Sequence, residues 1–130
     1  MYFGVDGYGK DMANLPYKAS ALIWIGDSKD ELSSFPLAVK RVFGFALRLV
    51  QNGEMPEIAK PLTGLGPGVY ELKDSADRQT FRVVYVVKLK NGVYVVDAFI
   101  KKSKRGSKTP KDVKERLEKR IAFARKADEE

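Results

Sequence analysis

A turn signal in the second half of the chain constrains the fold more than any other feature. Residues 80–89 and 93–101 are rich in valine and aromatic side chains, and Asn91 and Gly92 lie between them. An asparagine followed by a glycine is typical of the two-residue turn that joins antiparallel strands, because both positions take positive φ angles. Residues 69–73 form a third run of this kind. The sequence therefore predicts three consecutive antiparallel strands.

The remaining chain predicts one more strand and three helices. Apolar side chains in residues 36–52 recur at three- and four-residue spacing, as on the buried stripe of a helix. The expected bounds are residues 19–25 for the strand, 29–34 for a short helix capped by Asp27 or Ser28, 36–52 for the second helix and 110–126 for the last. This order, β-α-α-β-β-β-α, predicts an α+β fold with a mainly antiparallel sheet, two N-terminal helices and a basic C-terminal helix.

Two segments are not expected to form regular elements. Residues 54–68 hold three prolines and three glycines, so we expect a loop. Residues 1–18 show no clear period and are expected to form a weakly ordered extension. Because 130 residues suit one domain, we expect residues 19–130 to form a single unit.

Composition excludes several kinds of site. The chain holds no cysteine and no histidine. This rules out disulfides and a cysteine nucleophile, and it removes the usual acid–base side chain at neutral pH. We therefore expect no metal and no other cofactor. No apolar run reaches the ~20 residues that span a bilayer. No basic and then apolar leader is visible, so we expect a cytoplasmic protein without membrane contact.

Positive charge is concentrated near the C-terminus. Residues 1–100 hold 12 basic and 11 acidic side chains, whereas residues 101–126 hold 12 basic and 3 acidic ones. A local field of this sign attracts polyanions. Nucleic acid or an acidic protein is therefore the expected partner, and a merely solvated helix surface is the alternative.

Several segments together resemble one family. They read LIWIGDSKDELSSFP, LRLVQNGE, KPLTGLGPGVYEL, FRVVYV and DAFIKKSKRGSKTP. In their order and spacing they resemble the RelE/HigB-type toxins of prokaryotic toxin–antitoxin modules, most closely the phage-derived branch, over residues 19–126. The resemblance implies a small α+β domain and, as in the ribosome-dependent members, cleavage of messenger RNA. It also implies a helix-turn-helix antitoxin as the neutralising partner.

The implied cleavage is attack of a 2′-hydroxyl on the adjacent phosphorus, which leaves a 2′,3′-cyclic phosphate and a free 5′-hydroxyl. One group must take the 2′ proton, one must stabilise charge on the phosphoryl oxygens, and one must protonate the leaving oxygen. Without histidine, the proton transfers require a lysine or a tyrosine whose pKa is lowered. Crowded positive charge has that effect.

The resemblance assigns the phosphate contacts to basic residues on the strands. The motif FRVVY matches the family's arginine before two hydrophobic residues and a tyrosine, so Arg82 is expected to clamp the scissile phosphate. The alternative is an ion pair of Arg82 with Glu71 or Asp97. Lys73 is expected to stabilise charge in the transition state, and its alternative is a solvated strand end beside Asp74.

Two lysines at the end of the last predicted strand are candidates for the general base. The family's pattern of an aromatic residue, one further residue and two lysines matches Phe99 to Lys102. Lys101 and Lys102 point to opposite faces of a strand, so at most one of them shares a face with Arg82.

Further residues are expected to bind RNA or to pack in the core. Tyr70 is a candidate for stacking on a base, while Tyr85 and Tyr94 are expected in the core. The expected RNA-binding cations are Lys104, Arg105, Lys108, Lys111 and Lys114. Arg120 and Arg125 are expected on a solvated face of the last helix.

Two other functions remain open. A ParE-like toxin of the same fold would inhibit DNA gyrase through protein contacts and would need no phosphate clamp. A binding-only module would use its basic helix to hold nucleic acid or an antitoxin, and it would not arrest growth.

Overall fold

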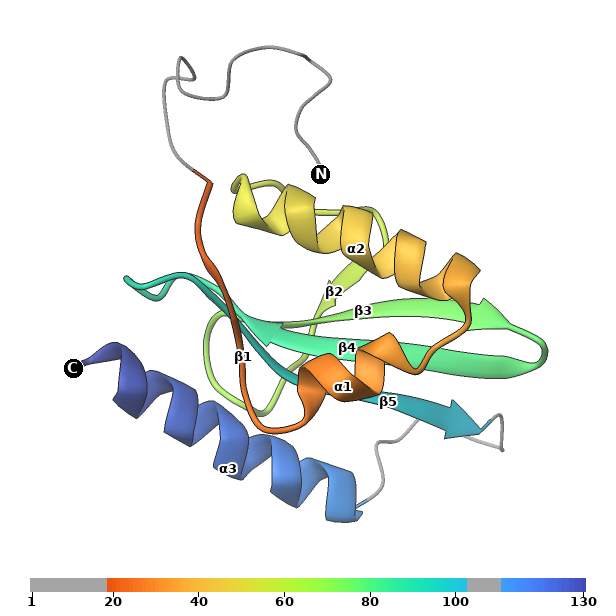
Figure 1. Ribbon diagram of the computed structural model, residues 1–130. Helices are drawn as coiled ribbons and strands as arrows, with labels where there is room; N and C mark the ends of the chain where they lie inside the picture. Colours follow the sequence, from red (N-terminus) through yellow and green to blue (C-terminus); the bar gives the residue numbers. More distant parts are fainter. Residues whose placement is uncertain (1–18, 103–110) are drawn as a thin grey trace, which may run out of the picture.

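The computed structural model describes residues 19–101 and 111–130 in full, and Lys102 by its backbone alone. Residues 1–18, which hold the expected N-terminal extension, and residues 103–110 lie outside the described part. Within it the chain forms three helices and five strands (Figure 1). Their bounds are β1 Leu22–Trp24, α1 Ser28–Ser33, α2 Leu37–Gln51, β2 Ala59–Pro61, β3 Val69–Ala76, β4 Gln79–Val86, β5 Val93–Lys102 and α3 Lys111–Asp128.

The five strands form one sheet in the order β1-β5-β4-β3-β2. β1 runs parallel to β5, and the other neighbouring pairs are antiparallel. The predicted element order and the mainly antiparallel sheet are confirmed, with β2 as an addition. This strand lies in the segment predicted to be a loop, and its Lys60 pairs with Glu71 of β3. Three residues are too few to show a period, and Pro61 is tolerated because β2 is an edge strand.

The expected two-residue turn at Asn91 and Gly92 is not formed. The connection between β4 and β5 is longer and covers residues 87–92. Asn91 is held instead by the end of α3, since its backbone N–H donates to Asp128 Oδ1 at 2.8 Å. At Gly92 a Cβ atom would come within 2.5 Å of the carbonyl oxygen of Ala21. Tertiary contacts, and not a tight turn, therefore account for asparagine and glycine at these two positions. The predicted antiparallel pairing of β4 with β5 is confirmed.

A two-residue turn does join β3 to β4. Asp77 and Arg78 have φ angles of 50° and 65°, the left-handed geometry that matches the twist of paired strands. β3 therefore extends to Ala76, beyond the predicted end at residue 73. Asp77 tolerates a positive φ angle, but Arg78 rarely adopts one and the turn has no glycine or asparagine, so the local signal was too weak to predict it.

Helices cover both faces of the sheet (Figure 1). On one face, α2 packs Val39 and Phe43 against Phe81 and other buried residues of the sheet. On the opposite face, α3 packs Leu117 and Ile121 against the sheet. β4 is consequently covered on both faces. None of the described helices is long and apolar enough to cross a membrane.

Polar contacts also hold α3 to the rest of the domain. Arg116 and Arg120 bind Asp97 of β5 at 2.7 and 3.3 Å. Arg120 also donates to the carbonyl oxygen of Val96 at 3.0 Å, and Arg125 Nη2 donates to that of Pro67 at 2.8 Å. The expectation of a solvated position for Arg120 and Arg125 was wrong, because both guanidinium groups bind the body of the domain.

The expected side-chain cap of α1 is also absent from its two candidates. Ser28 Oγ donates instead to the carbonyl oxygen of Val95 at 3.0 Å. Asp27 accepts from Arg120 Nη2 at 2.8 Å, which holds the pKa of this exposed carboxyl below its usual value. Both side chains thus join elements that are far apart in the sequence.

Candidate functional site

Three of the predicted catalytic residues share one face of the sheet. Lys73 of β3 pairs with Arg82 of β4, and Thr80 of β4 pairs with Lys101 of β5. Paired residues on neighbouring strands point to the same face, and so do residues two apart along one strand. Lys73, Arg82 and Lys101 therefore lie together, on the face that α3 covers. Lys102 pairs with Gln79 through its backbone, and its side chain lies outside the described part.

Arg82 forms a buried ion pair with Glu71. Its Nη1 donates to both carboxylate oxygens, at 2.8 and 3.0 Å. Only 8% of Arg82 and 9% of Glu71 are exposed. Of the two partners considered from the sequence, Glu71 is the one that the structure shows, because Asp97 is bound by α3. Glu71 is thus a member of the cluster that sequence reasoning treated only as an alternative partner.

Two buried cationic nitrogens of the cluster have no hydrogen-bond partner among the described residues. They are Arg82 Nε and Lys101 Nζ. A buried donor without a partner is costly, so such a group is explained by a bound water, an ion, strain or a catalytic role. Here both belong to positively charged side chains on the same face of the sheet. The arrangement can therefore bind an anion.

The surroundings of Lys101 destabilise its charged form relative to that of an exposed lysine. Burial lowers the pKa of its ammonium group, and the charges of Arg82 and Lys73 lower it further, while Glu71 opposes the shift. A lysine whose pKa is lowered can take a proton at a pH closer to neutral than an ordinary lysine can. Lys73 is exposed and lies at the edge of the same cluster.

Tyr70 lies on the opposite face of the sheet from Arg82. It pairs with Tyr85, and the two rings are stacked with centroids 5.9 Å apart. Tyr85 is buried, as expected, and burial raises the pKa of its hydroxyl. The structure does not bring Tyr70 together with the basic cluster.

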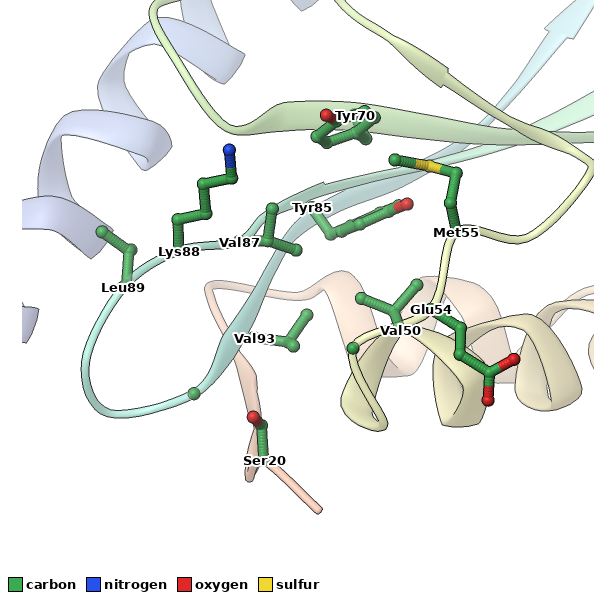
Figure 2. Close-up of a pocket in the computed structure, with 12 residues that line it drawn as sticks. Ser20, Val50, Glu54, Met55, Tyr70, Tyr85, Val87, Lys88, Leu89 and Val93 are labelled. Atoms are coloured by element: carbon green, nitrogen blue, oxygen red, sulfur yellow. The ribbon is translucent and has the colours of Figure 1, made fainter. Parts of the chain in front are cut away.

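Tyr70 and Tyr85 line a hollow of about 330 Å³ on this opposite face (Figure 2). Met55, Val50 and Glu54 come from the end of α2 and the chain that follows it, and Lys88 comes from the connection after β4. The hollow is separate from the Arg82 cluster because the sheet lies between them.

The other predicted RNA-binding residues fall into two groups. Lys111 and Lys114 are exposed on the first turns of α3. Lys104, Arg105 and Lys108 lie outside the described residues. In the described ranges, no group of three or more Asp and Glu side chains is arranged to hold a metal ion.

The chain is similar to known proteins both in sequence and in structure. The family model described as "Phage derived protein Gp49-like (DUF891)" matches residues 30–122. Among solved structures, a double arginine-to-alanine mutant of E. coli toxin RelE in the free state is similar, with 18% sequence identity and a TM-score of 0.53. The similarity covers 80% of this chain and 99% of the RelE chain. No curated protein sequence matches the chain.

These similarities confirm the resemblance seen in the sequence. The family match spans α2, the sheet from β2 to β5 and most of α3, so it includes the whole Arg82 cluster. The likeness to RelE extends over most of the chain and shows the fold. The chain therefore belongs to the phage-derived Gp49-like family and has the fold of RelE.

Proposed function

We propose that the protein is the toxin of a toxin–antitoxin module and cleaves messenger RNA on the ribosome without a metal. One observation carries the proposal: Lys73, Arg82 and Lys101 lie on one face of the sheet with two buried cationic nitrogens unpartnered among the described residues. A phosphodiester supplies the negative oxygens that such a cluster would bind. Membership of the Gp49-like family and the RelE fold support this choice.

In the proposed reaction, the ribose 2′-oxygen bonds to phosphorus while the bond from phosphorus to the 5′-oxygen breaks. Arg82 and Lys73 hold the phosphoryl oxygens, where negative charge grows. Lys101 in its neutral form takes the proton of the 2′-hydroxyl, because its pKa is lowered. The leaving 5′-oxygen takes its proton from water, because position 101 and not position 102 of β5 shares the face of Arg82. The products are a 2′,3′-cyclic phosphate and a 5′-hydroxyl.

The proposal includes the partners of the reaction. Lys111 and Lys114 on α3, with Lys104, Arg105 and Lys108, would hold messenger RNA or ribosomal RNA through phosphates. A helix-turn-helix antitoxin would neutralise the protein, and both partners place it in the cytoplasm. Tyr70 would contact RNA only if a strand passed around the sheet to the α2 face.

A second candidate is a ParE-like inhibitor of DNA gyrase, and a feature of α2 favours it. Val42, Phe45 and Leu49 line an apolar hollow of about 530 Å³ with Ile58 from the chain before β2. Phe45 is 67% exposed. An apolar patch of this kind is typical of a surface that binds another protein. This candidate does not use the phosphate cluster.

Expression in bacteria that lack the antitoxin tests the two candidates. Wild type is compared with Arg82→Ala and with Lys119→Ala, which removes an exposed charge from α3. Growth and the 5′ ends of messenger RNA are measured. Arrest with new ends inside reading frames, lost in Arg82→Ala but kept in Lys119→Ala, supports RNA cleavage. Arrest with intact messages in all three favours gyrase. Normal growth with soluble wild-type protein would leave a binding-only module.

A further inference from the structure

The charges in the Arg82 cluster are not balanced among the described residues. Arg82 and Lys101 place two cationic nitrogens in buried positions, and Lys73 adds a third positive charge at the edge. Glu71 is the carboxylate bound to Arg82. Asp97, on the same face, is already bound to Arg116 and Arg120. Buried charge is stable only when it is paired or neutralised, so the excess positive charge is relieved either by a bound anion or by loss of the Lys101 proton.

The contact between Arg82 and Glu71 uses only part of the guanidinium group. Both carboxylate oxygens accept from the single atom Nη1, and no described residue accepts a hydrogen bond from Nε. Arginine binds a phosphate best through two parallel N–H groups, which gives two hydrogen bonds in a fork. The pair with Glu71 is therefore not the geometry that fills the guanidinium group.

The burial of Arg82 also indicates that its guanidinium group is not open to a phosphate in the free protein. Arg82 is 8% exposed, and its Nε is closed off from solvent. A phosphate that approaches from water cannot reach this nitrogen unless a neighbouring group moves. Glu71 is negatively charged and contacts the same guanidinium group, so a phosphate would repel it.

We propose that Glu71 is an internal competitor for the phosphate, holding Arg82 closed in the free protein and leaving Nη1 when a phosphate binds. This rests on the proposed function, since it concerns the same site. The Glu71 carboxylate occupies Nη1 of Arg82 as long as no phosphate is bound. It thereby weakens the binding of isolated phosphate groups and favours a substrate that other contacts hold in place.

Competition and a purely structural role for Glu71 predict opposite changes in phosphate affinity when the Glu71 charge is removed. If Glu71 only positions Arg82, removing its charge misplaces the guanidinium group and weakens phosphate binding. If Glu71 competes, the amide of Glu71→Gln leaves Nη1 more easily and phosphate binds more tightly. Asp74→Asn is the matched control, because it removes the same charge from the same strand. Asp74 pairs with Phe81 and so lies on the opposite face.

The experiment measures binding of inorganic phosphate and of an uncleavable 2′-deoxy trinucleotide to the full chain at fixed ionic strength. We expect Glu71→Gln to bind both about tenfold more tightly than wild type, and Asp74→Asn to stay within about twofold. In wild type, the carbon-13 signal of the Glu71 carboxyl should shift on saturation with phosphate, as its contact with Arg82 opens.

Three results would overturn the proposal. In the first, Glu71→Gln binds no tighter than Asp74→Asn. In the second, neither wild type nor Glu71→Gln binds phosphate. In the third, the Glu71 carboxyl signal of phosphate-saturated wild type does not move, which decides the matter if Glu71→Gln fails to fold. Binding needs no cleavage, so a protein that shows this competition but leaves messages intact would refute only the nuclease.

Discussion

Asp128, at the end of α3, accepts a hydrogen bond from the buried hydroxyl of Tyr94 at 3.1 Å. The same carboxylate accepts from the backbone N–H groups of Lys90 and Asn91 at 2.9 and 2.8 Å. One side chain therefore joins the last turn of α3 to β5 and to the connection before it. This contact fixes the C-terminal half of the helix on the sheet.

The protonation of Asp128 should contribute to the pH dependence of stability. Burial raises the pKa of this carboxyl, but the hydrogen bonds from Asn91, Lys90 and Tyr94 outweigh burial and hold it below its ordinary 3.8. A group with a lowered folded-state pKa stabilises the protein above its unfolded-state pKa, and this contribution is lost as the pH falls through the folded-state pKa. Asp128→Asn should lower the urea midpoint at pH 7, and the difference from wild type should shrink below pH 4. Glu129→Gln, an exposed neighbour, should show no such difference.

Asp97 should be the most sensitive polar residue of the α3 interface. It is 1% exposed and bound by Arg116 and Arg120. Removing one member of a buried ion pair leaves uncompensated charge, which costs about 3–5 kcal/mol. We expect Asp97→Ala to lower the free energy of unfolding by that amount in urea denaturation. Asp30→Ala, on the exposed side of α1, should change it by less than about 0.5 kcal/mol. Equal effects of the two variants would contradict this role.

Lys101 should determine the pH dependence of cleavage. A base must be neutral, so the rate should rise with pH up to the lowered pKa of Lys101 and then level off. Lys101→Arg keeps the charge but cannot give up its proton, and it should reduce the rate at least ~100-fold and remove this rise. The measurement is cleavage of messenger RNA on purified ribosomes, with Lys119→Arg as the control. A profile that keeps the same rise in Lys101→Arg would assign the base to another group.

Replacing the Arg82–Glu71 pair should abolish function while leaving stability nearly unchanged. Replacing a buried ion pair with apolar side chains of similar volume is often neutral for stability. The double variant Arg82→Met with Glu71→Leu should therefore remain within about 1–2 kcal/mol of wild type. It should not arrest growth, because the phosphate contact is gone. If it folds and still cleaves messages, Arg82 is not the clamp.

Phe43 and Phe45 offer a matched pair on one helix. Phe43 is fully buried against the sheet, whereas Phe45 lies in the exposed hollow. Phe43→Ala should destabilise the protein by about 3–5 kcal/mol. Phe45→Ala should change stability by less than about 0.5 kcal/mol. If α2 binds gyrase or an antitoxin, Phe45→Ala should weaken that complex in a pull-down while RNA cleavage is unchanged. Weakened cleavage with intact partner binding would show that the hollow serves the RNA site.

Much of the candidate site could be predicted from strand alternation. Lys73 and Glu71 are two residues apart on β3, so they share a face, and Tyr70 points the other way. The separation of Tyr70 from the cluster was thus contained in the sequence. The choice between Glu71 and Asp97 as the partner of Arg82 was not, because it depends on α3. Arg116 of that helix binds Asp97, so Arg82 pairs with Glu71.

The sequence by itself determined the element order, the alternation of β4 and the apolar stripe of α3. These features are local, since each depends on periodicity within one segment. Only the tertiary structure decided the parallel pairing of β1 with β5, the edge strand β2 and the roles of Asn91 and Arg120. Each of these depends on a contact between residues far apart in the chain. The energy of such a contact exists only when both partners have been brought together, so no single segment contains it.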